Sequence, residues 1–260
     1  RAQALRIDQA QLRELLGETE LRELLDPEVI AQLEAQLALR DARYRLRHAD
    51  AVHDALLRLG DLSEAELVQR AESASAMRDF IRALSSARRI VRVRLGRPTA
   101  ARFIAVEDAA RYRDALGVAL PDDAVPAALL APAADTTGTT DETDPLKALL
   151  ARYARTHGPF SAAEVSARWG LGTSVVSAEL ARLVAAGKLL EGAFRPGGDA
   201  REYVHPDVLR SLRQRSLSKL RQQIEPVDAA VFGRFAMHHH GLTQPRAGLD
   251  AVLDAVERLQ

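Results

Sequence analysis

Residues 63–106 read SEAELVQRAESASAMRDFIRALSSARRIVRVRLGRPTAARFIAV, and this stretch decides the fold. It opens on a capping box, in which Ser63 caps a helix and Glu66, three residues on, reaches back to the backbone. One helix is predicted before this stretch, and the capped helix is the second. After a turn, a third helix is predicted at about 74–87. The remaining residues have the pattern of a β-hairpin.

The hairpin is predicted from its alternating residues. Strands are expected at 90–95 and 101–106, around a tight turn at 96–98. In the first strand apolar residues alternate with Arg92 and Arg94, so one face is apolar and the other is basic. Three helices followed by such a hairpin are typical of a winged helix.

The same order of elements occurs a second time, over about 146–217. Its capping box is Ser161 with Glu164, about 98 residues after the first one. A third helix is predicted at 173–186. Strands are predicted at 188–194 and 201–205, around Pro196-Gly197-Gly198, where glycines allow a tight turn. A spacing of this size is too long for a solenoid and indicates tandem winged-helix domains, mainly α with small β-hairpins (α+β).

The domain organisation follows from these copies and from composition. Residues 121–144 contain three Pro, five Thr, six acids and no aromatic residue, so we expect a mobile acidic linker. We predict the following units: 1–45, a helical segment completing a preceding unit; 46–120, a winged helix; 145–212, a winged helix; 213–260, a basic helix and the start of a third. The chain starts without Met and stops within an amphipathic pattern, so a fragment of a larger protein is expected.

Composition excludes several classes of protein. The absence of cysteine rules out a disulfide scaffold, a thiolate zinc site, an iron–sulfur cluster and a cysteine nucleophile. No apolar run approaches the ~20 residues of a membrane span, so we expect a cytoplasmic protein. The formal net charge is zero across 260 residues, and taken as a total this argues against nucleic acid as a partner.

Counted by segment, the charges are separated. Residues 1–41 hold nine acids and five bases, and residues 121–144 hold six acids and no base. Residues 88–102 hold six arginines and no acid, and residues 208–224 hold five bases and no acid. The two basic blocks are candidates for contact with nucleic acid. Arg outnumbers Lys 33 to 3, which a GC-rich genome explains equally well.

In a winged helix, the third helix enters a groove and the wing contacts the backbone. The candidate nucleic-acid-binding residues lie on the two third helices, the two wings and the last basic helix. They are Arg78, Arg82, Arg88, Arg89, Arg92, Arg94, Arg97, Arg102, Ser174, Lys188, Arg195, Arg201, Arg210, Arg213 and Arg221. The alternatives are an arginine-rich edge strand that prevents aggregation, and a basic helix that packs on an acidic neighbour such as 14–34 or 121–144.

Other motifs are interpreted structurally. Thr173 is expected to cap the helix that it opens, and Trp169 is expected in the core. In the helix at 207–223, four leucines are expected to face inward: Leu209, Leu212, Leu217 and Leu220. Three consecutive histidines, 238–240, lie ~100° apart on a helix and cannot face one ion, so no metal is predicted. The sequence has no phosphate loop and no catalytic motif, so no catalytic residue is assigned.

Specific stretches resemble a known family. They are VEDAARYRDALGVALP from Val106, LLARYARTHGPFSAAEVSARWGLG from Leu149, LLEGAFRPGG from Leu189, RSLSKLRQQIEPV from Arg215 and the ending GLDAVLDAVERLQ. Together they resemble the C-terminal region of bacterial large helicase-related (Lhr-type) superfamily 2 DNA helicases. The region is also similar to tandem winged-helix DNA glycosylases.

The resemblance implies an ATP-dependent helicase that moves 3′ to 5′, unwinds DNA or RNA–DNA duplex and is linked to DNA repair. It implies ATP and Mg²⁺ for the whole protein, with no cofactor in this part. Single-stranded DNA or an RNA–DNA hybrid is the implied partner, and a homo-oligomer is implied by some relatives. Since the family's linker is often shorter, fixed packing between the two copies is not expected. Two alternatives remain: an assembly module without DNA contact, and the scaffold of a glycosylase-like domain.

Overall fold

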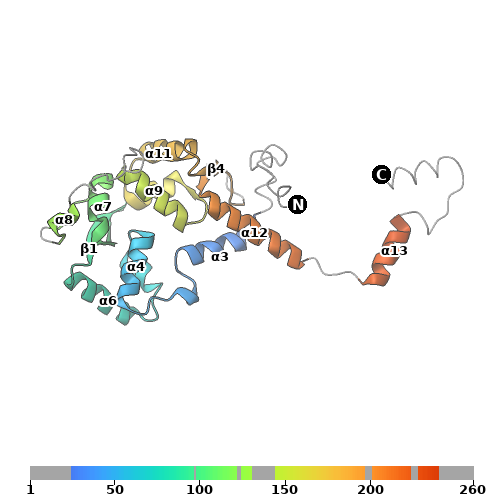
Figure 1. Cartoon of the computed structure of the whole chain (residues 1–260), viewed down its shortest axis with the longest axis horizontal. Coiled ribbons are helices and arrows are strands. Elements are labelled where there is room, and N and C mark those ends of the chain that lie inside the picture. The colour runs from blue at the N-terminus through green and yellow to red at the C-terminus, as the bar shows by residue number, and fades with distance from the viewer. Residues whose placement is uncertain are drawn as a thin grey trace, which may run out of the picture. The chain divides into compact units, whose positions relative to one another are not determined.

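The computed structural model describes residues 25–96, 98–121, 124–130, 144–196, 201–223 and 228–239. The first winged helix comprises α4 (Ala49–Leu59), α5 (Glu64–Val68), α6 (Ala74–Ser86), β1 (Ile90–Leu95), β2 (Ala100–Ala105), the 3-10 turn η3 (Val106–Asp108) and α7 (Ala109–Leu116) (Figure 1). The hairpin alternates as the sequence predicted, because Val91, Val93 and Leu95 are buried while Arg92 and Arg94 are exposed.

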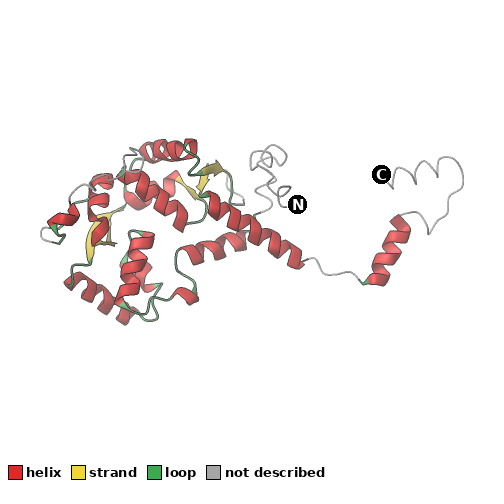
Figure 2. Ribbon diagram, viewed as in Figure 1, coloured by secondary structure: helices red, strands yellow, loops and turns green. Residues whose placement is uncertain are grey.

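The second winged helix repeats this order. It comprises α9 (Pro145–Thr156), β3 (Phe160–Ser161), α10 (Ala162–Trp169), α11 (Thr173–Ala185), β4 (Leu190–Gly192), β5 (Glu202–Val204) and α12 (Pro206–Gln223). The protein is mainly helical with small antiparallel sheets, as Figure 2 shows, which confirms the predicted α+β winged-helix fold. The second sheet has the order β3-β5-β4. A bridge between Leu62 and Phe103 is the counterpart of β3–β5 in the first copy.

The two capping boxes are present as predicted. The Ser63 hydroxyl accepts from the Glu66 amide at 3.2 Å, and the Glu66 carboxylate accepts from the Ser63 amide at 2.7 Å. Ser161 and Glu164 repeat the arrangement. The expectation for Thr173 is wrong. The N-cap of α11 is Gly172 and makes no side-chain cap, since Thr173 is already the first residue of the helix.

Three apolar cores hold the described residues together. One lies within the first winged helix and includes Leu56 and Met77. A second, larger core joins both copies, because Val91 and Val93 of the first hairpin pack with Leu150 and Trp169 of the second copy. The two winged helices are therefore fixed against each other, contrary to the expectation from the linker length.

Part of the predicted linker is structured. Residues 127–130 form the short helix α8 (Ala127–Leu130), and the buried Val125 belongs to the shared core. The Arg113 guanidinium donates to the Leu130 carbonyl at 3.1 Å. Apolar side chains thus hold 124–130 to the first copy, although the composition indicated mobility. Residues 131–143 lie outside the described residues.

The N-terminal helix packs within this chain. In α3 (Pro27–Leu37), Asp26 caps the first turn, and the buried face carries Val29, Ile30 and Leu33. These residues form the third core with side chains of the second wing and α12, including Phe194 and Leu209. Helix α3 therefore packs on the second winged helix, whereas Leu39, which follows it, belongs to the core of the first. Residues 1–24 lie outside the described residues.

The described residues up to Leu217 form one compact unit, and a second unit begins at Ser218. The second unit contains α13 (Ala229–His239), with Phe232 and Phe235 largely exposed. The unit predicted at 213–260 is therefore described only in part, because residues 240–260 lie outside the described residues. Within the described parts of the chain, no helix is long and apolar enough to cross a membrane.

Candidate nucleic-acid interface

The outer face of the first hairpin carries the most accessible predicted cations. Arg92 and Arg94 are exposed on β1 and make no ion pair with any described residue. Arg88 is exposed just before the strand, where the chain adopts a left-handed conformation with a φ of 54°. Arg97, at the turn, lies outside the described residues. This face therefore presents Arg88, Arg92 and Arg94 with their charges available to a partner.

Arg89 is less available than its neighbours. Its guanidinium contacts the Asp50 carboxylate and approaches Nδ1 of His53 at 3.1 Å. His53 is itself buried, and its Nε2 lies 3.1 Å from the Glu107 carboxylate. Arg89 therefore ties the start of β1 to α4, a structural use of its charge.

Arg102 does not lie on the basic face, which corrects the prediction. It stands opposite Val93 in the β1–β2 register, and directly paired residues of a hairpin point to the same face. Because Val93 faces the shared core, Arg102 does too, and its side chain is only 15% exposed. It forms ion pairs with Asp61 at 3.0 Å and Glu66 at 2.8 Å.

The third helix of the first copy carries both predicted arginines at its surface. Arg78 pairs with Glu64 at 3.2 Å, and Arg82 pairs with Asp79 at 2.9 Å. All four side chains are more than half exposed, and exposed pairs of this kind contribute little to stability. Both arginines therefore remain accessible, but each would have to exchange a carboxylate for a phosphate.

The second wing is more neutral than the sequence indicated. Arg195 binds the carboxylates of Glu164 and Glu202, and Arg201 pairs with Glu191 at 2.8 Å. Lys188 is exposed, and Ser174 is exposed in the first turn of α11. The structure therefore uses Arg195 to join the wing to α10, and Lys188 is the predicted cation of this wing that forms no ion pair with a described residue.

Helix α12 presents a partly basic surface. Arg210 pairs with Asp207 at 2.5 Å, Arg221 is exposed, and Arg213 is half-buried. The expectation that Leu217 and Leu220 face inward is wrong, because each is 44% exposed. The buried residue of that turn is Ser216, whose hydroxyl accepts from the Asp26 amide at 3.1 Å.

Helix α12 packs on α3. The alternative that this basic helix packs on an acidic neighbour within 14–34 is therefore correct in part. The contact is apolar, and Arg215 reaches the Gln36 amide oxygen at 2.8 Å rather than an acidic side chain. The Arg215 side chain therefore binds an amide of α3 and not a carboxylate.

Charged groups join the two copies at Asp61, which is 1% exposed. Arg168 of the second copy binds the carboxylates of Asp61 and Glu66. Although burial opposes it, the charges of Arg168 and Arg102, with the Ser63 amide, lower the pKa of Glu66 to about 2. Burial also opposes the charge on Arg168, but Asp61 and Glu66 raise its pKa above the usual value. Glu66 and Arg168 are therefore held in their charged states.

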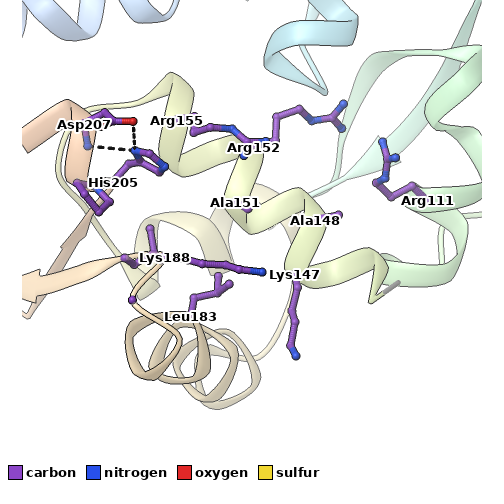
Figure 3. A pocket seen from close by; sticks show the side chains of 13 residues that line it. Arg111, Lys147, Ala148, Ala151, Arg152, Arg155, Leu183, Lys188, His205 and Asp207 are labelled. Atoms are coloured by element: carbon purple, nitrogen blue, oxygen red, sulfur yellow. Dashed lines mark hydrogen bonds and ion pairs between the residues drawn. The ribbon is translucent and has the colours of Figure 1, made fainter. Parts of the chain in front are cut away.

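The sequence analysis missed a second group of basic residues. Lys147 and Arg155 lie eight residues apart on α9, and with Arg111 of α7 and Lys188 they line a groove (Figure 3). A spacing of eight on a helix places Lys147, Ala151 and Arg155 on one face. This helical spacing indicates a shared basic face. A count of charges in contiguous segments does not reveal it, because the basic residues of this group are not contiguous in the sequence.

The described residues contain no group of three or more side chains that could hold a metal ion. His238 and His239 end α13, and His240 lies outside the described residues. The sequence of this chain contains no phosphate loop, so the ATP and Mg²⁺ implied by the resemblance stay an expectation for the whole protein.

Comparison with known proteins gives the family. Residues 23–132 match the family model of the large helicase-related protein, winged-helix domain, and similarity to relatives extends over the whole chain. The chain belongs to the large helicase-related (Lhr) family. The resemblance based on the sequence motifs is thereby confirmed.

Two relatives show the extent of the match. The chain is 39% identical over 261 residues to a "Lhr helicase/probable uracil glycosylase" of Mycolicibacterium smegmatis, covering 100% of the chain and 16% of that protein. It is 30% identical over 275 residues to a "Lhr helicase/uracil glycosylase" of Escherichia coli, covering 100% of the chain and 17% of that protein. The chain thus spans about a sixth of the length of these Lhr relatives.

Proposed function

We propose that this region binds the phosphate backbone of nucleic acid without reading its sequence, as an accessory part of an Lhr-type helicase. The observation that carries the proposal is the outer face of β1, where Arg92 and Arg94 are exposed without a carboxylate partner among the described residues. Arginine binds phosphate through a planar fork of donors, and such contacts position a protein on nucleic acid without specifying sequence.

The rest of this surface supports the same mode. Arg88 extends the face by one cation, and Arg78 and Arg82 lie on the adjacent third helix. Sequence-tolerant stacking on bases requires exposed aromatic rings. Trp169, the only tryptophan, is 5% exposed, so it cannot serve as a stacking platform. Electrostatic contact is therefore the mechanism that these residues can provide.

The test is a titration of a labelled single-stranded oligothymidylate at several salt concentrations. A hairpin variant combines Arg92→Gln with Arg94→Gln. A control variant combines Arg43→Gln with Arg47→Gln, two exposed arginines outside the proposed surface. Loss of two phosphate contacts lowers the slope of log affinity against log salt by about 1.4 for a single strand. An unchanged slope and affinity in the hairpin variant would refute the proposal.

The activity of the whole protein is part of this proposal. Unwinding in the 3′ to 5′ direction, DNA repair, and the use of ATP and Mg²⁺ would depend on residues outside this chain. Single-stranded DNA or an RNA–DNA hybrid would be the substrate, and the winged helices would hold the strand. The names of the two relatives also include uracil glycosylase, so a scaffold for base excision is the third hypothesis.

Assembly is the second candidate, because α13 exposes Val231, Phe232, Phe235 and Met237 by 44–63%. An exposed apolar stripe of this kind fits a second copy of the chain. Light scattering at low and high salt separates the two functions. An oligomer that persists at high salt and ignores DNA would favour assembly over backbone binding.

A further inference from the structure

A groove of about 660 Å³ lies between α9, the loop before β4 and the start of α12 (Figure 3). Lys188 extends its side chain from that loop toward α9, and Arg111 enters from α7. The lining contains five arginine or lysine side chains and one histidine but only one carboxylate, that of Asp207. The basic side chains and the histidine are Arg111, Lys147, Arg152, Arg155, Lys188 and His205.

The carboxylates of the described residues compensate only part of this lining. Asp207 pairs with Arg210, outside the groove, at 2.5 Å, and it lies 3.8 Å from Nδ1 of His205. Arg111 and Arg152 share one buried carboxylate, that of Asp108. Arg155 and Lys188 are exposed and form no ion pair with any described residue. The groove therefore has an excess of positive charge, which selects an anion.

Two smaller hollows continue the groove at its ends. One, of about 260 Å³, shares Lys147, Leu183 and Lys188 with it and adds Arg182. The other, of about 220 Å³, shares Arg155, His205 and Asp207 and reaches α3. The three hollows form an elongated track, and a track with cations along its length fits an extended polyanion better than an isolated phosphate.

We infer that this track is a second nucleic-acid site, which binds the phosphodiester backbone of one single strand. Its volume is that of a small-molecule pocket, so the backbone of one strand can enter it. No phenylalanine, tyrosine or tryptophan lines it, so it makes no stacking contact with bases and tolerates any sequence. The inference rests on the proposed nucleic-acid binding but places it on different residues from the hairpin.

The first experiment compares three variants that each remove two cations. A groove variant combines Arg155→Gln with Lys188→Gln and is measured beside the hairpin and control variants against labelled oligothymidylate. The groove variant should bind several-fold more weakly than the control at low salt, with a salt slope lower by about 1.4. Retained α-helical circular dichroism and an unchanged melting temperature identify the loss as a binding effect.

The variants separate the two proposals. If the hairpin variant loses affinity while the groove variant matches the control, the groove inference is overturned and the proposed function stands. If only the groove variant loses affinity, the track binds the strand and the hairpin mechanism fails. Affinity equal to the control in both variants rejects the two together.

The second experiment locates the strand directly and keeps every cation. Because the chain contains no cysteine, Ala151→Cys places a single thiol in the groove lining. Oligothymidylate should slow the reaction of this thiol with a neutral maleimide by several-fold, and Ala42→Cys, exposed elsewhere, should react at an unchanged rate. Inorganic phosphate at the same total phosphate concentration should not protect Ala151→Cys. Equal protection by phosphate would show a site for a discrete anion, and an unprotected thiol would place the strand elsewhere; either result overturns the inference.

Discussion

The indole Nε1 of Trp169 donates a hydrogen bond at 3.0 Å to Oδ1 of Asp61, which belongs to the other winged helix. The same oxygen accepts from the Tyr112 hydroxyl at 3.1 Å, and Oδ2 accepts from Arg102 at 3.0 Å. One buried carboxylate thus holds donors from both copies. In a buried network, removal of one charge leaves its partners without compensation, so Asp61 controls the joint between the winged helices.

Replacement of this carboxylate should destabilise the whole joint. Asp61→Asn leaves Arg102 and Arg168 sharing only Glu66, so we expect the free energy of unfolding to fall by about 3 kcal/mol. Urea denaturation followed by Trp169 fluorescence measures the change, since this indole contacts the altered group. Asp79→Asn removes an exposed carboxylate and should change stability by less than about 0.5 kcal/mol. Equal effects of the two substitutions would contradict a structural role for Asp61.

The close approach of the two copies at the hairpin turn gives a second prediction. Gly96 has a φ of +90°, and a Cβ there would lie 2.9 Å from the Arg168 carbonyl oxygen. Gly96→Ala therefore adds a backbone clash to the usual strain of about 1 kcal/mol for a left-handed residue.

Gly117→Ala is the matched control for this substitution. Its φ is +64° and no atom lies within 4 Å of the added Cβ, so only the conformational strain remains. Thermal melting should show a clearly larger loss for Gly96→Ala than for Gly117→Ala. Similar melting temperatures would mean that the turn moves away from the second copy without cost.

The sequence predicted the repeated winged helix because capping boxes and alternation are local patterns. Ser63, Glu66 and the β1 arginines behave as these patterns indicate. The joint between the copies could not be predicted in this way, since Asp61 and Trp169 are 108 residues apart and neither stands in a recognisable motif. The linker composition even indicated the opposite arrangement. Tertiary contacts of Val125 and Leu130 overrode a sequence that is locally typical of mobile segments.

The sequence predicted only part of the candidate site, again because local patterns do not show which residues become neighbours after folding. Charge counts placed Arg92 and Arg94 correctly at the surface but grouped Arg102 with them, because a count ignores which face of the strand a residue occupies. The groove cations come from α7, α9 and the second wing, so they become neighbours only after folding. A helical spacing of eight was the one local indication, and it involves Lys147 and Arg155 alone.

The difference between Arg102 and Arg92 is itself testable. Arg102→Gln should lower the free energy of unfolding by about 3 kcal/mol, because it leaves Asp61 with one fewer compensating charge in a buried network. Arg92→Gln should leave stability within about 0.5 kcal/mol of the original, since the residue is exposed. Binding of oligothymidylate, measured where both proteins are folded, should weaken only for Arg92→Gln. If Arg102→Gln reduced binding without reducing stability, its side chain would have to leave the ion pair and reach the strand.

The last prediction concerns acid. Burial, assisted by the charge of Arg168, lowers the pKa of His157 to about 4, and the ring stacks on Tyr153 with centroids 3.7 Å apart. The folded state therefore binds fewer protons than the unfolded state, in which this pKa is near 6.5. The contribution of the neutral histidine to stability is complete above pH 6.5 and is lost as the pH falls toward 4, by at most about 3 kcal/mol. Glu66, with its pKa lowered to about 2, loses its contribution in a separate range, below pH 4.5.

His157→Phe keeps a stacked ring and removes the titration, so the two pH ranges can be separated. In this variant the free energy of unfolding should fall less between pH 6.5 and 4 than in the original protein. The further fall below pH 4.5 should remain, because Glu66 and its arginines are unchanged. Glu66→Gln should show the reverse pattern. Urea denaturation at intervals across this range measures both effects, and parallel curves for His157→Phe and the original protein would show that His157 titrates normally in the fold.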